Sequence, residues 1–176
     1  MSIYMVQHAF SKPEWEQEWN EWYAGNLIVL MKVPGFITGQ RFKALDGSPP
    51  RYMAMYTVSS PEVFESAIYT ESGGGGTASQ RFRPAYSVWI RNLFEGLSQA
   101  PDVHADEVLM VLDSPEVPTQ YSGVKLEAMQ TTGFHRTTPA RGLGVIKRSE
   151  VERIPKMDNL IFYEALTHQQ GFIPKS

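Results

Sequence analysis

Residues 14–36 (EWEQEWNEWYAGNLIVLMKVPGF) restrict the possible folds of this 176-residue chain more than any other segment. The segment holds three of the four tryptophans, and its large side chains recur at intervals of three or four residues. This spacing is typical of one face of an α-helix, and Pro34-Gly35 ends the segment. A helix of roughly 20 residues is about 30 Å long, enough to cross one face of a sheet. The residues expected on the shared face are Trp15, Trp19, Trp22 or Tyr23, Asn26 and Leu30.

The start of this helix is marked by Ser11 and Glu14, which have the spacing of a capping box. Glutamates continue through the first turns, where the helix dipole favours negative charge. We therefore expect the helix to begin at this point in the chain.

Strand-forming residues lie on both sides of the helix. Residues 2–10 predict a first strand, and residues 35–45 and 51–59 predict a hairpin around a Gly/Pro turn. A second, shorter helix is expected over 60–69 and a fourth strand over 87–94. The resulting order is the βαββαβ arrangement of ferredoxin-like domains, an α+β fold with both helices on one face of an antiparallel sheet.

Alternation along the first strand predicts which side chains share a face of this sheet. Because both helices cover one face, the other face is left bare and apolar, and something has to cover it. The two expected sets are Ile3, Met5 and Gln7 on one face and Tyr4, Val6 and His8 on the other.

The second half of the chain contains a weak echo of the first. Residues 106–114 resemble the first strand, a short helix is expected at about 121–131, and residues 159–166 resemble the third strand. We interpret this as a degenerate second βαββ unit that has lost its last helix and strand. The expected organisation is a ferredoxin-like α/β-barrel unit at 1–98 with a second unit at 105–170 packed on it.

Two such units can close a barrel within one chain, or each can pack against a neighbouring subunit. The sequence leaves both arrangements open. A bare apolar sheet face favours a homodimer, because isologous pairing hides that face from water.

Composition excludes several classes of protein. The chain is 42% hydrophobic and 20% charged with a net charge of −3, so it can bury a core and is not disordered. Sixteen basic residues form no run, which argues against nucleic acid and anionic membranes as partners. The N-terminus lacks the pattern of a signal peptide, and the longest apolar run, 27–31, is too short to span a bilayer. We expect a soluble cytoplasmic protein.

Metal and thiol chemistry are also disfavoured. The chain has no cysteine, which removes disulfides, thiol nucleophiles and thiolate metal ligands. Its four histidines, at positions 8, 104, 135 and 168, show no metal-binding spacing. We expect no metal and no cofactor.

A series of short motifs along residues 2–95 resembles the dimeric α/β-barrel superfamily, and within it the EthD-like and stress-responsive barrel proteins. In those proteins a helix with Trp-Tyr-x-x-His leads into Pro-Gly-Phe and an Arg-Phe strand. This chain has asparagine where the family usually has that histidine. The matching motifs are Trp22-Tyr23-x-x-Asn26, Pro34-Gly35-Phe36, Arg41-Phe42, residues 51–56 (RYMAMY), Ser60-Pro61-Glu62 and Ala67-Ile68-Tyr69.

The resemblance implies a small, mostly apolar pocket between the sheet and the helices. It does not imply one reaction, because the superfamily includes cofactor-independent monooxygenases, cyclases, isomerases, haem-degrading oxygenases, dehydratases, decarboxylases and proteins without an assigned activity.

Three residues are candidates for catalysis. His8 could act as a general base, Tyr23 could supply a proton, and the amide of Asn26 could bind a carbonyl or a developing oxyanion. Each also has a purely structural interpretation. His8 would be a hydrogen-bonded or solvated histidine at the end of a strand, and Tyr23 an aromatic residue of the core. Asn26 would be a polar residue whose hydrogen bonds are satisfied at the helix–sheet junction. The residues expected to bind substrate are Trp19, Trp22, Arg41, Tyr56 and Arg81.

Four consecutive glycines, 73–76, do not lead into a Lys-Ser/Thr helix, which argues against a phosphate loop. A mobile loop is the simplest interpretation, and a lid over the pocket is the more specific functional hypothesis.

Three functions remain open at this stage. The leading one is a cofactor-independent lyase or isomerase that uses acid–base chemistry on a small aromatic or cyclic organic acid or ketone. The first alternative is a cofactor-free monooxygenase of an aromatic substrate. The second is a non-enzymatic, stress-associated barrel that binds a small molecule.

Overall fold

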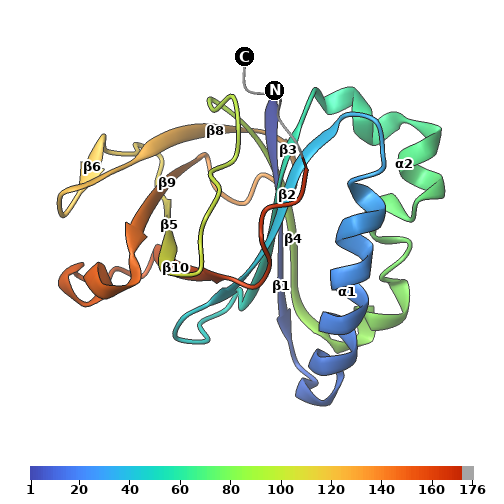
Figure 1. Cartoon of the computed structure of the whole chain (residues 1–176), viewed down its shortest axis with the longest axis horizontal. Coiled ribbons are helices and arrows are strands. Elements are labelled where there is room, and N and C mark those ends of the chain that lie inside the picture. Colours follow the sequence, from blue (N-terminus) through green and yellow to red (C-terminus); the bar gives the residue numbers. More distant parts are fainter. Residues whose placement is uncertain (172–176) are drawn as a thin grey trace.

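Eight antiparallel strands close into one barrel in the computed structural model of the protein, which describes residues 1–171 (Figure 1). Around the barrel the strands follow the order β1-β3-β2-β10-β5-β9-β8-β4. The strands are β1 (Ser2–Phe10), β2 (Phe36–Ala44), β3 (Tyr52–Val58), β4 (Tyr86–Glu95), β5 (Glu107–Asp113), β8 (Glu127–Phe134), β9 (Ala140–Lys147) and β10 (Leu160–Ala165).

Two helices lie on the outside of the first half of the barrel (Figure 1). The long helix α1 (Glu16–Leu30) connects β1 to β2, and the short helix α2 (Ala67–Glu71) precedes β4. Each follows a 3₁₀ turn, Pro13–Trp15 before α1 and Pro61–Glu65 before α2. The strands and helices expected along 2–95 are therefore present in the expected order.

The predicted capping box is wrong. Lys12 occupies the cap position of the 3₁₀ turn before α1, and no side chain caps it. Ser11 instead bonds to the carbonyl oxygen of Ala85, through its backbone N–H at 2.9 Å and its hydroxyl at 3.3 Å. Pro13 sets the first turn because its fixed φ suits that position and it has no N–H to satisfy.

Alternation along β1 is confirmed. Ile3 and Met5 belong to the apolar core inside the barrel, and Tyr4 and Val6 belong to the core beneath the helices. Every residue from position 2 to position 9 is buried, because the first half of the sheet is covered on both faces.

The barrel closes within one chain. Strand β10 pairs with β2, and β8 pairs with β4, so the second half covers the inner face of the first. The bare face that favoured a homodimer is thus buried inside the chain. The homodimer itself stays a prediction, as does the division into units at 1–98 and 105–170.

The two halves of the barrel repeat one strand order. Written around the barrel, the first half is β4-β1-β3-β2 and the second is β10-β5-β9-β8. If the strands of each half are numbered along the chain, both halves follow the order 4-1-3-2. Residues 160–165 therefore occupy the place of β4, and the expectation that the second half had lost its last strand is wrong.

The helix expected at 121–131 is also wrong. That stretch contains the hairpin β6 (Gln120–Tyr121) and β7 (Val124–Lys125), followed by the beginning of β8. Strand β8 is needed to pair with both β4 and β9, so tertiary pairing overrides the local preference. The second half has no α-helix among residues 105–171; the hairpin and a 3₁₀ segment, Arg148–Arg153, take the places of the two helices.

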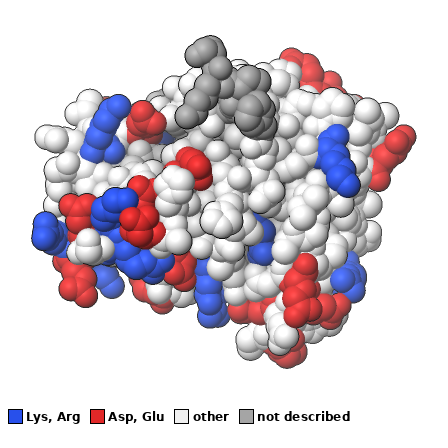
Figure 2. Space-filling view, viewed as in Figure 1, with Lys and Arg blue, Asp and Glu red and all other residues white. Residues whose placement is uncertain are grey.

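On the face shown in Figure 2, acidic and basic residues are interspersed and surround a broad uncharged area. None of the helices in residues 1–171 has the length and apolar character required to cross a bilayer. The cytoplasmic location stays a prediction.

One end of the barrel is closed by the segment 96–106, which joins β4 of the first half to β5 of the second half. Gln40, fully buried, donates to the carbonyl oxygens of Val103 (2.7 Å) and Thr167 (2.9 Å) and accepts from the N–H of Val103 (3.1 Å). The N–H of Ala100 donates to Thr57 at 2.9 Å. This segment therefore forms a plug held by buried hydrogen bonds.

We expect Gln40→Leu to lower the free energy of unfolding by about 2–3 kcal/mol, because it leaves the N–H and C=O of Val103 buried without partners. Urea denaturation curves of the wild type and the variant, fitted with one shared m-value, measure this loss of unfolding free energy. The matched control is Gln17→Leu on the exposed face of α1, expected to change stability by less than about 0.5 kcal/mol. Equal stability of the two variants would contradict the role of the plug.

Candidate active site

A pocket lies between the outer face of the sheet and the helices. Strands β1, β3 and β4 form its floor, α1 forms one side, and the glycine segment 73–76 forms another. Its volume is about 40 Å³, room for a few water molecules or a dioxygen molecule. The side chains that line it are mainly aromatic: Tyr4, His8, Trp22, Tyr23, Asn26, Tyr56, Tyr69, Trp89 and Arg91, with Val6, Leu30 and Ser79.

His8 is a neutral group in this pocket. Only 2% of the residue is exposed, and its ring packs against Trp19 and Tyr86, with 4.9 Å between ring centres in both pairs. Burial, with a smaller contribution from the nearby charge of Arg41, lowers the pKa of His8 to about 3. A base this weak does not take up a proton near pH 7.

Three tyrosines of the pocket, Tyr4, Tyr23 and Tyr56, stay protonated. Burial raises the pKa of Tyr23 to about 12, and burial also raises the pKa values of Tyr4 and Tyr56 well above the ordinary value. The hydroxyl of Tyr56 is buried and has no hydrogen-bond partner within residues 1–171. These phenols can donate hydrogen bonds to a ligand, but they do not supply phenolate.

Arg41 is already engaged by the protein. Its guanidinium donates to the carbonyl oxygen (3.1 Å) and the side-chain oxygen (2.6 Å) of Asn20. It also lies 4.7 Å from the ring centre of Tyr23 and 5.2 Å from that of Trp19. Arg41 therefore holds α1 on the sheet and does not line the pocket.

Arg91 is the residue that sequence analysis missed. It lies on β4 opposite Val6 of β1, and its guanidinium lies over Phe134 (4.7 Å) and Trp89 (5.0 Å). Its Nε is buried and has no hydrogen-bond partner, and no ion pair to Arg91 occurs within the described residues. The pocket thus contains a cation whose contacts are with aromatic rings, which is a suitable arrangement for an anion.

The glycine segment 73–76 packs closely against aromatic rings of the pocket. The N–H of Gly75 donates to the hydroxyl of Tyr69 at 2.9 Å. A Cβ at Gly74 would lie 2.5 Å from the ring of Tyr69, and one at Gly76 would lie 2.7 Å from the ring of Trp89. Glycine is therefore required for the close approach, and Gly76 also has a positive φ of 84°.

Five of the eight residues predicted from the sequence meet in the pocket: His8, Trp22, Tyr23, Asn26 and Tyr56. The other three do not line it. Trp19 lies behind the pocket and donates to the hydroxyl of Tyr86 at 2.8 Å. Arg81 is exposed and forms an ion pair with Glu18 at 2.8 Å, and Arg41 binds Asn20.

No group of three or more His, Asp or Glu residues within residues 1–171 is arranged to hold a metal ion.

Comparison with protein families and with curated proteins finds no match for this chain. Solved structures do match over almost the whole chain. A candidate monooxygenase from Lactobacillus acidophilus NCFM aligns with a TM-score of 0.60 and 7% identity, covering 98% of this chain and 97% of that one. An anthrone oxidase-like protein aligns with a TM-score of 0.57 and 9% identity, covering 96% and 92%. A candidate chlorite dismutase aligns with a TM-score of 0.52 and 10% identity, covering 95% and 96%.

At these identities the likeness shows a shared fold. The chain shares an α/β-barrel architecture with these structures, and its membership of the dimeric α/β-barrel superfamily stays a prediction. The narrower EthD-like assignment stays a prediction.

The burial of His8 predicts a pH dependence of stability. The folded-state pKa of about 3 lies below the ordinary value of 6.5, so the unfolded chain takes up a proton first as the pH falls. The contribution of neutral His8 is intact above pH 6.5 and is lost at up to about 1.4 kcal/mol per pH unit between 6.5 and 3.

We therefore expect the free energy of unfolding to fall between pH 6.5 and 4.5 by roughly 2–3 kcal/mol more in the wild type than in His8→Phe. The phenyl ring suits the aromatic surroundings and does not titrate. Urea denaturation at several pH values provides the measurement, and parallel curves for the two proteins would contradict the assignment of His8 as neutral.

Proposed function

We propose that the protein is a cofactor-independent monooxygenase that oxidises an electron-rich aromatic substrate. The observation that carries the proposal is Arg91, an unpaired cation in an aromatic pocket whose histidine and tyrosines stay neutral at pH 7. Such a pocket stabilises an anionic substrate next to space for dioxygen. The names of the structural neighbours, a candidate monooxygenase and an anthrone oxidase-like protein, support this reaction class.

The lyase or isomerase activity expected from the sequence is wrong. Two of the structural neighbours are named as a candidate monooxygenase and an anthrone oxidase-like protein, which favours the monooxygenase alternative. The acid–base chemistry also loses an effective general base, because burial lowers the pKa of His8 to about 3 and so weak a base does not abstract a substrate proton efficiently near pH 7.

The proposed reaction takes all its electrons from the substrate. A substrate with an acidic aryl CH₂ group ionises by giving a proton to bulk water, and the guanidinium of Arg91 binds and stabilises the resulting anion. For a CH₂ group, the carbanion adds dioxygen to form a C–O bond and a peroxide anion. Protonation and loss of water then give C=O, so one oxygen atom enters the product and the other leaves in water.

The neutral side chains have supporting roles in this scheme. Phenol hydroxyls, including the unpaired one of Tyr56, can donate to the substrate oxygen or to the peroxide. The amide of Asn26 on α1 can donate in the same way from the other side of the pocket. Trp22 supplies a flat wall for an aromatic ring.

The pocket must expand to admit an aromatic substrate. Its volume is about 40 Å³, whereas a cavity of about 150 Å³ holds a benzene molecule. The glycine segment 73–76 is the wall best suited to move, because the backbone of glycine can adopt a wider range of φ and ψ angles than that of any other residue. We assign this segment the role of a lid that opens for substrate entry.

The narrower family is part of the proposal. We assign residues 1–98 to a ferredoxin-like, EthD-like unit, and residues 105–170 to a second copy whose helices have been replaced. The repeated 4-1-3-2 strand order supports this origin.

The first experiment compares reactions in air and under argon. The metal-stripped protein is incubated with anthrone, hydroquinones and aryl acids, and the products are analysed by mass spectrometry. We expect product in air alone, carrying one oxygen atom from ¹⁸O₂. Conversion under argon, or product without the label, would exclude the monooxygenase proposal.

Removal of the cation should slow the reaction. We expect Arg91→Met to lower kcat/KM about 100-fold, because one preorganised charge that stabilises a developing anion contributes on this scale. Arg91→Lys should restore part of the rate, and Arg148→Met, at an exposed arginine on the opposite half of the barrel, should change it less than about twofold. Equal rates for Arg91→Met and Arg148→Met would remove Arg91 from the mechanism.

A further inference from the structure

The end of the barrel opposite the plug contains a second cavity. Its volume is about 290 Å³, and it lies inside the barrel, on the other side of the sheet from the pocket beneath α1. Gln7 and His8 are neighbours on β1, yet Gln7 lines this inner cavity and His8 lines the outer pocket. The two cavities are therefore separate sites on opposite faces of one strand.

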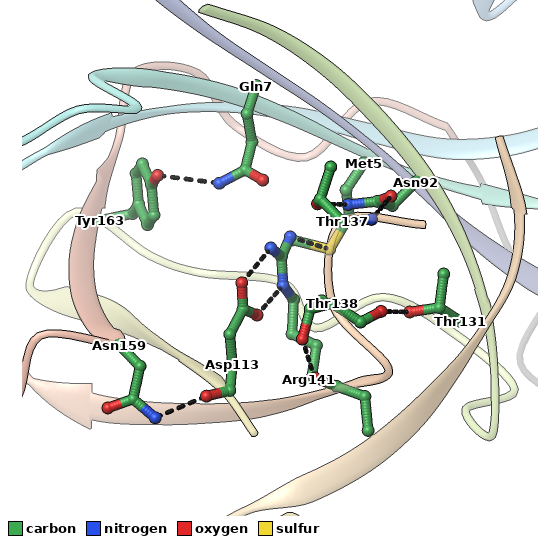
Figure 3. Close-up of polar contacts among 11 residues, drawn as sticks. Met5, Gln7, Asn92, Asp113, Thr131, Thr137, Thr138, Arg141, Asn159 and Tyr163 are labelled. Atoms are coloured by element: carbon green, nitrogen blue, oxygen red, sulfur yellow. Dashed lines mark hydrogen bonds and ion pairs between the residues drawn. The ribbon is translucent and has the colours of Figure 1, made fainter. Parts of the chain in front are cut away.

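Two charged residues of this cavity, Arg141 and Asp113, form an ion pair. Arg141, on β9 and 2% exposed, donates from Nε and Nη2 to the two carboxylate oxygens of Asp113 at 2.6 and 2.8 Å (Figure 3). The pair is charge-neutral. Among residues 1–171, the acceptor of the remaining nitrogen, Nη1, is the thioether sulfur of Met5 at 3.6 Å. Because sulfur is a weak acceptor, Nη1 keeps the capacity to donate to a stronger one.

Gln7 provides a hydrogen-bond acceptor that complements the donor on Arg141. Its amide nitrogen donates to the hydroxyl of Tyr163 at 3.2 Å, and that hydroxyl donates to the carbonyl oxygen of Pro50 at 2.7 Å. These two bonds fix the orientation of the amide, and Figure 3 shows its oxygen turned away from Tyr163. Within the described residues, the Gln7 side chain makes no other hydrogen bond, so its carbonyl oxygen is available to a donor.

Charge and wall composition restrict the ligand. The charge of Arg141 is already neutralised by Asp113, and Asp158 adds a negative charge at the rim, so an anion is disfavoured. Apolar side chains, among them Val111 and Ile161, form the walls. The cavity therefore places a donor, Nη1 of Arg141, and an acceptor, the side-chain oxygen of Gln7, beside apolar surfaces, with Thr137 and Asn159 as further uncharged polar residues of its lining.

We propose that this barrel cavity binds a small, uncharged cyclic or secondary amide. The carbonyl oxygen of the ligand accepts from Nη1 of Arg141, and its N–H donates to the side-chain oxygen of Gln7. The ring or alkyl part of the ligand contacts Val111 and Ile161. The site is independent of the oxidation proposed for the pocket beneath α1.

The test is a titration of the full chain with 2-pyrrolidone, followed by ¹⁵N NMR of the Gln7 side-chain amide and of the backbone amides of β1, β5 and β9. We expect saturable shifts at these positions. N-methyl-2-pyrrolidone, which lacks the N–H, should bind about tenfold more weakly, the equivalent of one lost hydrogen bond. Sodium acetate should not produce saturable shifts.

Two variants make the test specific. Gln7→Leu should weaken binding of 2-pyrrolidone about tenfold, and Ile161→Phe, which fills the cavity, should abolish it. The matched control is Ile28→Phe, the same change at a 53% exposed position on α1, and it should leave the affinity unchanged. Shifts that do not saturate, or equal affinity in the wild type and in Ile161→Phe, would overturn the proposal; this second variant keeps it testable if Gln7→Leu does not fold.

Discussion

Burial of both faces of one sheet is the constraint on which the rest of the structure depends. Strand β1 is buried along almost its whole length, so its alternate side chains supply two different cores. The face toward the helices has to accommodate α1, and the face toward the barrel has to meet the second half of the chain. This separation puts His8 and Gln7, adjacent in sequence, into cavities with different chemistry.

Low polarity determines what the outer pocket can do. The environment that packs α1 on the sheet also removes water from the titratable groups, and burial keeps the imidazole and the phenols neutral. A neutral, aromatic surrounding makes the single unpaired guanidinium of Arg91 more effective, because a charge interacts more strongly where water is excluded. The packing of the helix and the stabilisation of a substrate anion thus have the same physical cause.

Much of the first half could be predicted from sequence, because helix and strand periodicities are local properties. The spacing of Trp19 and Tyr23 predicted the buried face of α1, and alternation predicted that Tyr4, Val6 and His8 share one face of β1. Barrel closure could not be predicted, since a period of two does not say which edges pair. The sequence also could not show which of Arg41 and Arg91 faces the pocket, because both lie on strands beneath the helices. Only the contact with Asn20 shows that the guanidinium of Arg41 is already bound.

The two halves share a strand order but have different outer layers, which explains why the proposed active site belongs to the first half. In the second half, Gly142 and Gly144 on β9 let the covering segment approach closely; a Cβ on them would lie 2.7 Å from Val117 and 2.9 Å from Val124. In the first half the corresponding layer is rich in large aromatic side chains, and Tyr56 on β3 and Trp22 on α1 both line the pocket between the sheet and the helix. Side-chain size therefore differs between the corresponding layers: glycines on β9 let the covering segment lie close to the sheet, whereas aromatic residues line the pocket of the first half.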